Sequence, residues 1–119
     1  MSTRSRIGML DNGIVTSIYC HFDGYPSGNG KVLLDKYRTK SKVEDLIMGG
    51  NLSSLGSLSY YVQRGESYED NAPSTVSLEN IGKLFDGWIE YVYVFDCNSN
   101  KWNILENSEL KELTMEMCK

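Results

Sequence analysis

The chain has 119 residues, of which 40% are hydrophobic, and its 12 basic and 16 acidic side chains give a formal net charge of −4. This length and composition suit one folded domain with a modest core. The acidic balance argues against a general nucleic-acid binder, which carries a basic excess. No apolar run approaches the roughly 18 residues that a membrane span needs.

The cysteine pattern indicates a reducing compartment. Cys20, Cys97 and Cys118 are odd in number and far apart in the sequence. The basic first residues lack the apolar core of a signal peptide. We therefore expect free thiols in a cytosol rather than a disulfide framework.

The first predicted element is a β-hairpin. Asn12-Gly13 separates an apolar run (7–10) from a β-rich run (14–21), a strong signal for a type I′ turn. Alternation in the second strand predicts one face toward the core and His21 on the other face. The predicted core-facing residues are Ile14, Thr16, Ile18 and Cys20.

Two short helices are predicted next. A glycine-rich loop over 23–30 leads into a helix over 31–38. A second helix is expected to begin at Ser41, because a Glu three positions later completes a capping box. Glycines at 49 and 50 are predicted to end this helix.

The middle of the chain gives weaker signals. Residues 58–62 favour a strand, and residues 64–75 favour an exposed acidic loop. Ser77 can cap a short helix that ends at Gly87.

The strongest strand signal runs from Trp88 to Asp96, where aromatic and β-branched residues dominate. Residues 101–105 are predicted to return as its hairpin partner. A last helix is expected to begin at Asn107 or Ser108, because apolar residues follow at i, i+3 and i+7.

These elements predict an α+β fold. We expect an antiparallel sheet of about five strands with two or three short helices packed on one face. The whole chain, 1–119, forms a single domain in this prediction, and residues 105–119 form a helical C-terminal extension.

The segment from Ile18 to Gly28, Ile-Tyr-Cys-His-Phe-Asp-Gly-Tyr-Pro-Ser-Gly, resembles the central motif of a family of small proteins encoded mostly by bacteriophages and prophages. A Thr-Arg-Ser-x-Ile start (3–7), a Gly-Asp-Ile-Ser-Ser-Leu-Gly-like link (50–56, here Gly-Asn-Leu-Ser-Ser-Leu-Gly) and the aromatic hairpin extend the resemblance to about residue 104. Phe22 stands where the relatives often have Trp. The resemblance implies a phage accessory protein that acts in an infected bacterial cell, and it supplies no catalytic residues.

Cys20, His21 and Asp23 could supply metal ligands or a nucleophile and base. Adjacent strand residues point to opposite faces, so Cys20 and His21 cannot easily share one ion or one proton. We favour a structural interpretation, with Cys20 as a small buried hydrophobe and His21 hydrogen-bonded to the loop, for example to Asp23. No metal, cofactor or catalytic residue is predicted.

Two other stretches have alternative interpretations. Gly28 to Lys31 before a helix could cradle an anion, although the spacing is not that of a P-loop. In the aromatic strand one face is core, and the other is either covered by the protein's own helices or forms an interface. The tail helix either supplies that cover or binds a second copy in a homodimer.

Our leading hypothesis is a non-enzymatic, phage-encoded protein that binds and inhibits a bacterial host protein in the host cytoplasm. An anti-defence role, such as blocking a nucleic-acid-binding CRISPR effector, suits an acidic loop that competes for a basic channel. The expected partner-binding residues are Glu66, Tyr68, Glu69, Asp70, Tyr91 and Tyr93.

The alternative hypothesis is a small-molecule binder that sequesters a nucleotide signal of a host immune pathway. Cationic and aromatic side chains near the glycine-rich loop would contact the phosphate and the base. The expected ligand-binding residues are Tyr19, His21, Tyr25 and Lys31, with Arg4 and Arg6 as further cations. An enzyme using Cys20 or His21 is a third hypothesis.

Overall fold

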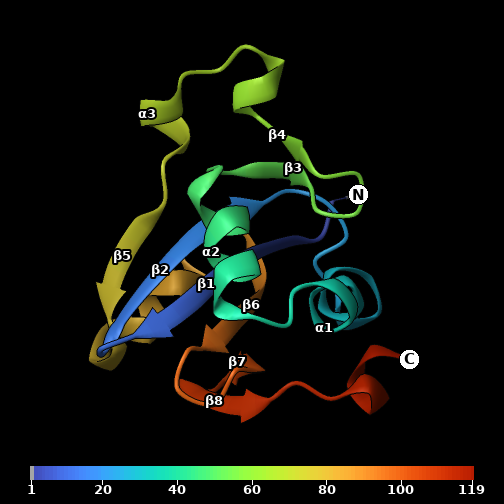
Figure 1. Ribbon diagram of the computed structural model, residues 1–119, viewed down its shortest axis with the longest axis vertical. Coiled ribbons are helices and arrows are strands. Elements are labelled where there is room, and N and C mark those ends of the chain that lie inside the picture. The colour runs from blue at the N-terminus through green and yellow to red at the C-terminus, as the bar shows by residue number, and fades with distance from the viewer. Residues whose placement is uncertain (1) are drawn as a thin grey trace.

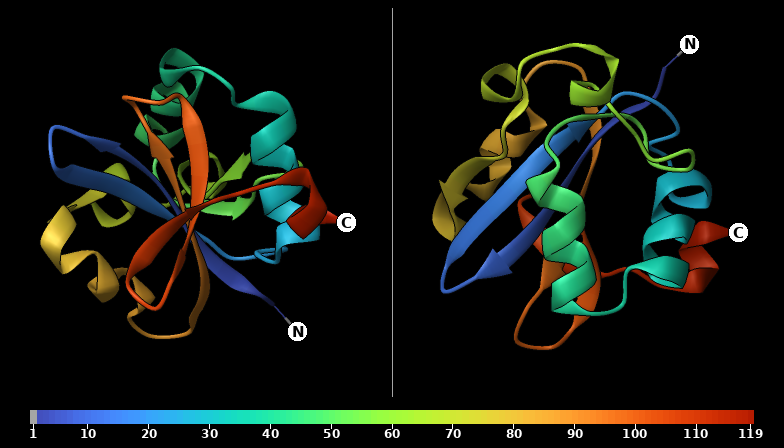
Figure 2. Two further views of the ribbon diagram at one scale, coloured as in Figure 1. Left: turned by 90° about the horizontal axis from the view of Figure 1, so that it is seen from below. Right: turned by 45° about the horizontal axis from the view of Figure 1, so that its top comes forward.

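One mixed β-sheet forms the frame of the protein. The computed structural model describes residues 2–119. Within them, eight strands pair in the order β4-β3-β2-β1-β6-β7-β8, with β5 also paired to β2 (Figures 1 and 2). The strands are Arg4–Asp11 (β1), Ile14–Cys20 (β2), Leu52–Ser54 (β3), Ser59–Tyr60 (β4), Ser74–Ser77 (β5), Ile89–Asp96 (β6), Lys101–Glu106 (β7) and Glu109–Glu112 (β8).

The predicted α+β class is confirmed, but the prediction of about five antiparallel strands is wrong. β1 runs parallel to β6, and β2 runs parallel to β3. Parallel neighbours need a long crossover rather than a tight turn, so no local turn signal reveals them. Four of the strands have four residues or fewer, which is too short for alternation to identify them reliably.

The predicted N-terminal hairpin is confirmed. Asn12 and Gly13 have φ values of 52° and 76°, as a type I′ turn requires. Ile18 and Cys20 are buried as expected. Ile14 is 43% exposed beside the turn, so its predicted place in the core is wrong.

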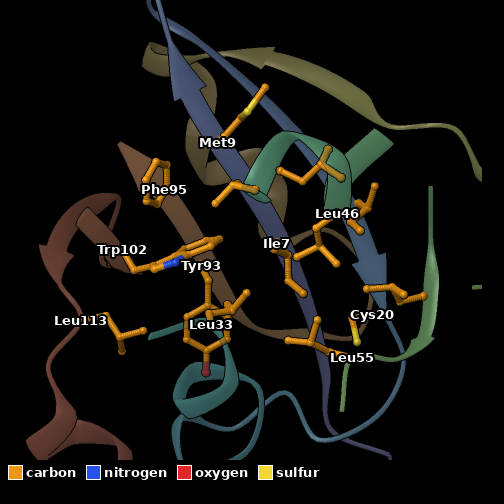
Figure 3. Close-up of a cluster of buried hydrophobic side chains, with 14 of the residues drawn as sticks. Ile7, Met9, Cys20, Leu33, Leu46, Leu55, Tyr93, Phe95, Trp102 and Leu113 are labelled. Atoms are coloured by element: carbon orange, nitrogen blue, oxygen red, sulfur yellow. The ribbon is translucent and has the colours of Figure 1, made fainter. Parts of the chain in front are cut away.

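Both faces of the sheet are covered. Two helices, α1 (Lys31–Lys36) and α2 (Lys40–Met48), lie over one face and enclose the larger hydrophobic cluster (Figure 3). A 3₁₀ segment, η3 (Leu78–Phe85), takes the place of the helix predicted after Ser77 and covers the other face with a smaller cluster. Alternate residues of β6 therefore enter different clusters, Tyr93 the larger and Val94 the smaller.

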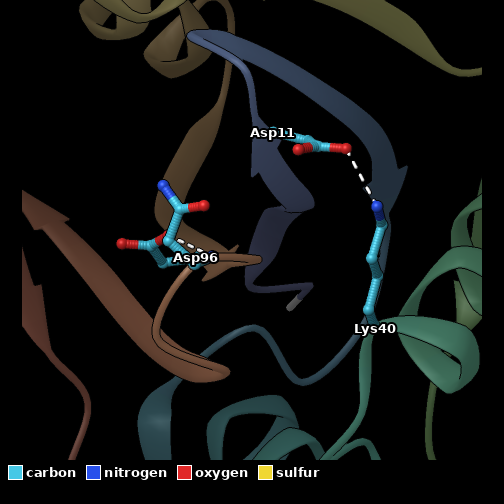
Figure 4. Close-up of polar contacts among 4 residues, drawn as sticks. Asp11, Lys40 and Asp96 are labelled. Atoms are coloured by element: carbon cyan, nitrogen blue, oxygen red, sulfur yellow. Dashed lines mark hydrogen bonds and ion pairs between the residues drawn. The ribbon is translucent and has the colours of Figure 1, made fainter.

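The first turn of α2 is capped by Thr39. The backbone N–H of Lys42 donates to Thr39 Oγ1 at 3.3 Å, so the capping box predicted at Ser41 is wrong. Lys40 Nζ lies 3.0 Å from an Asp11 carboxylate oxygen at the hairpin turn (Figure 4). Both side chains are well exposed, so this ion pair adds little stability.

The helix predicted over 105–119 does not form. Leu105 instead pairs with Leu110 across the β7–β8 turn, where Asn107 and Ser108 both have positive φ. A short 3₁₀ turn, η4 (Met115–Cys118), follows β8. The β6–β7 turn is fixed by the Asn98 N–H, which donates to the Asp96 carboxylate at 2.9 Å (Figure 4).

The remaining segments are short. A π-helical turn, η1 (Pro26–Gly30), leads directly into α1. The strand predicted over 58–62 is reduced to β4, with the 3₁₀ turn η2 (Val62–Arg64) after it. The predicted acidic loop contains a helical turn, α3 (Tyr68–Asn71), and the start of β5. Within residues 2–119, no helix combines the length and apolar character needed to cross a membrane.

Candidate functional site

The corner at residues 18–28 has the properties of a structural element. Cys20 is fully buried, and burial raises the pKa of its thiol, which disfavours the nucleophilic thiolate. The side-chain amide of Asn29 donates to Phe22 O at 3.0 Å, to Ser5 Oγ at 3.3 Å and to Cys20 Sγ at 3.4 Å. The prediction that Cys20 is a small buried hydrophobe is confirmed.

His21 lies directly after β2 and bonds to Tyr19 near the end of that strand. Its Nδ1 lies 2.6 Å from Tyr19 Oη, and its ring packs edge-on against Phe22. Asp23 instead accepts a hydrogen bond from Tyr25 Oη at 3.0 Å, so the expected His21–Asp23 contact is wrong. In the part of the chain that the structure describes, no three His, Cys, Asp or Glu side chains are grouped to hold a metal ion.

The four residues predicted to bind a nucleotide signal do not form one site. Tyr19 lies on the face of β2 opposite Ile18 and Cys20, the face that η3 covers. Lys31 begins α1, which covers the other face. Tyr25 is exposed on the loop between them. Tyr19 and Lys31 are therefore separated by the sheet.

Tyr19 instead lines a cationic groove that we call the Arg6 groove. It has a volume of about 410 Å³ and lies among β1, β2, β5, η3 and the start of β6. Its polar and aromatic lining residues include Arg4, Arg6, Tyr19, Lys83, Asp86 and Trp88. A second hollow of about 520 Å³ is also lined by Arg4 and Trp88, so the two hollows adjoin each other at these side chains.

The Arg6 guanidinium is held by neutral groups. Nε donates to Ser17 Oγ at 3.0 Å, and Nη2 donates to Ser17 O at 3.1 Å and to Ser74 Oγ at 3.0 Å. Burial lowers the pKa of Arg6 from its usual value, but an arginine keeps its charge at neutral pH. The groove thus holds a fixed positive charge whose hydrogen-bond partners carry no countercharge.

Three cations and two carboxylates line the two hollows. Arg4, Arg6 and Lys83 are opposed by Asp86 and Glu90. None of these five forms an ion pair with another described residue. The local balance is positive in a chain whose formal net charge is −4.

Trp88 is the most exposed of the large hydrophobic side chains, at 79%. It borders both hollows, and β6 begins one residue later. The sequence patterns predicted Trp88 as the first residue of a strand over 88–96, and they did not predict that Trp88 or Lys83 would adjoin Arg6. That juxtaposition depends on how η3 packs over the sheet, which the helical spacing of its residues did not indicate.

The acidic segment, residues 66–70, is exposed throughout. It is nevertheless fixed to the fold, because Tyr68 Oη donates to Met48 O at 2.8 Å. Ser67 caps α3 by accepting from the Asp70 N–H at 3.2 Å. Glu66, Glu69 and Asp70 form no ion pair with any residue in 2–119. The segment presents three uncompensated carboxylates on an ordered backbone.

The two tyrosines predicted to bind a partner from the aromatic strand differ in burial. Tyr93 is fully buried, and its hydroxyl donates to Gly24 O at 2.6 Å. Tyr91 is half-buried and stacks on Tyr93 with ring centroids 6.4 Å apart. The prediction that Tyr93 contacts a partner is wrong, because the sheet is covered on both faces by the protein's own segments.

Comparisons with protein-family models, curated proteins and solved structures find no match to this chain.

Proposed function

We propose that the protein is a non-enzymatic inhibitor that binds a bacterial host protein, with an anti-defence role of the anti-CRISPR type in the host cytoplasm. The observation that carries this proposal is the exposed acidic segment at residues 66–70, whose three carboxylates have no ion-pair partner among the described residues. The resemblance of the Ile18–Gly28 motif to phage-encoded proteins supports the anti-defence setting.

The acidic segment suits competition with nucleic acid. A nucleic-acid-binding effector presents Lys and Arg side chains along a basic channel, and those side chains contact phosphates. Carboxylates held on an ordered backbone can occupy the same cations, and like-charge repulsion keeps other acidic proteins away. The bond from Tyr68 Oη to Met48 O reduces the ordering cost that a mobile acidic loop would incur on binding.

A binding role also agrees with the state of the reactive side chains. Cys20 is buried beneath the corner, and Asn29 is hydrogen-bonded to its sulfur. His21 is engaged with Tyr19. These contacts favour a structural role for both residues over acid–base or nucleophilic work.

The test is a phage plating assay in a bacterium with active CRISPR interference. Expression of the protein should restore plaque formation by a targeted phage. The Glu66→Gln/Glu69→Gln/Asp70→Asn variant should lose most of this effect, because it removes three charges while keeping side-chain shape. The tagged protein should also co-purify with a stoichiometric effector subunit.

A matched control neutralises three other exposed carboxylates. Glu44→Gln/Asp45→Asn/Glu79→Gln makes the same change in net charge away from the acidic segment, at residues that form no ion pair within 2–119. This variant should inhibit normally. Normal inhibition by the residue 66–70 variant would show that the acidic segment is not the contact surface, and failure to restore plaques against any CRISPR type would refute the anti-CRISPR role.

A further inference from the structure

The Arg6 groove combines two features that the fold does not need. Trp88 leaves 79% of its side chain exposed at the rim, where it adds little to either hydrophobic cluster. Arg4 and Lys83 line the same groove, and neither forms an ion pair with a described residue. Exposed aromatic surface beside unpaired cations is characteristic of a ligand site.

Arg6 is arranged to receive an anion. Its Nε and Nη2 are bonded to Ser17 and Ser74, which fix the plane of the guanidinium. Nη1 makes none of these bonds. This nitrogen is not fully buried, because the described part of the chain contains no fully buried side-chain nitrogen or oxygen without a hydrogen-bond partner. The free edge of a fixed guanidinium can donate charge-assisted hydrogen bonds to a phosphate at small entropic cost.

We propose that the Arg6 groove binds a free nucleotide, with its phosphate at Arg6, Arg4 and Lys83 and its base stacked on Trp88. The carboxylates of Asp86 and Glu90 supply acceptors that suit ribose hydroxyls or a base amino group. This site differs from the inhibitory surface at residues 66–70, so either proposal can fail without the other.

Size and charge favour a single nucleotide over a polymer. The groove of about 410 Å³ lies within the range of roughly 300–1,000 Å³ typical of small-molecule sites. A bound polynucleotide extends beyond such a groove and meets a chain with a net charge of −4. Non-specific binding of nucleic acid needs a continuous track of basic side chains. The three cations of the Arg6 groove are instead grouped around one hollow.

The binding test uses the full chain with AMP, GMP, CMP and UMP, and with adenosine and inorganic phosphate as half-ligands. Calorimetry should show that at least one nucleotide binds about tenfold or more tightly than either half-ligand, because phosphate and base contacts add. Stacking should also quench tryptophan emission, since Trp88 is 79% exposed and Trp102 only 3%. The absence of nucleotide binding, or equal binding of phosphate alone, would overturn the proposal.

Variants locate the site. Lys83→Ala and Trp88→Ala alter exposed side chains, and each should weaken nucleotide binding by about tenfold. The matched control is Lys42→Ala on α2, which covers the opposite face, and it should bind as the wild type does. Unchanged affinity in both groove variants, or an equal loss in the control, would place the site elsewhere. A short oligothymidylate that binds more tightly than every nucleotide would also refute the assignment to a free nucleotide.

Discussion

Three tyrosines donate their hydroxyls to backbone carbonyls, and they differ mainly in burial. Tyr93 Oη lies 2.6 Å from Gly24 O, Tyr60 Oη lies 2.7 Å from Leu46 O, and Tyr68 Oη lies 2.8 Å from Met48 O. Tyr93 is fully buried, Tyr60 is half-buried and Tyr68 is 44% exposed. Replacing each tyrosine with Phe removes one hydroxyl, and the three hydrogen bonds that are lost have nearly the same length.

Tyr93→Phe should lower the free energy of unfolding by about 2 kcal/mol. A lost hydrogen bond costs about 1 kcal/mol, and the stranded buried carbonyl of Gly24 adds at least as much. At Tyr68 water can replace the hydroxyl, so Tyr68→Phe should cost less than about 0.5 kcal/mol. Tyr60→Phe should fall between them, near about 1 kcal/mol.

Urea unfolding followed by tryptophan fluorescence and by circular dichroism measures all three variants. The two probes should give one transition, and the slope with urea should match that of the wild type. An equal loss in Tyr93→Phe and Tyr68→Phe would refute the reasoning, because it would show that burial of the acceptor does not set the cost.

Two further predictions concern a helix cap and a pH range. Thr39→Ala should lower the free energy of unfolding by about 1 kcal/mol, because it removes the N-cap of α2. Ser41→Ala should change it by no more than about 0.5 kcal/mol in the same urea assay. Equal losses of stability in the two variants would contradict the capping by Thr39. Stability should also fall as the pH rises from about 10 to about 12: burial raises the pKa of Tyr60 to about 12, and the unfolded tyrosine releases its proton first, near pH 10. Tyr60→Phe should make this fall shallower in urea titrations across that range, and an unchanged pH dependence would argue against Tyr60 as a contributor.

Local sequence signals correctly predicted the elements whose partners are near in the sequence or whose residues strongly favour one structure. Asn12-Gly13 identified the first hairpin, and the aromatic run before Asp96 identified β6. The prediction of a C-terminal helix was wrong for a specific reason. Leu110 and Leu113 are three residues apart, which matches one face of a helix, yet they lie on opposite sides of the sheet in different clusters. β8 has only four residues, of which Leu110 alone is partly buried, so the sequence there shows no apolar alternation that would have indicated a strand.

The candidate sites likewise divide into features that local sequence signals indicated and features that only tertiary packing produces. The exposed acidic segment was recognisable because a run of carboxylates near a turn is almost always solvated. The Arg6 groove was recognisable only in part. Tyr19 lies on the predicted hairpin, but Arg4 and Arg6 precede its first predicted strand. Only in the structure, where β1 begins at Arg4, does Arg6 pair with Tyr19. Lys83 and Trp88 line the groove because of how η3 packs over the sheet. Tertiary packing determines that position, and no periodic pattern in the sequence indicates it.

The position of β1 also determines how the chain can fold. β1 pairs with β2 through a two-residue turn. Its other edge pairs with β6, which is distant in the sequence, so that Arg4 pairs with Ile89. Closing so long a loop is entropically costly, and such non-local pairing slows folding. During synthesis the N-terminal hairpin therefore stays with an open edge until most of the chain has left the ribosome. That edge is exposed to aggregation or to chaperone binding for this interval, and the arrival of β6 ends it.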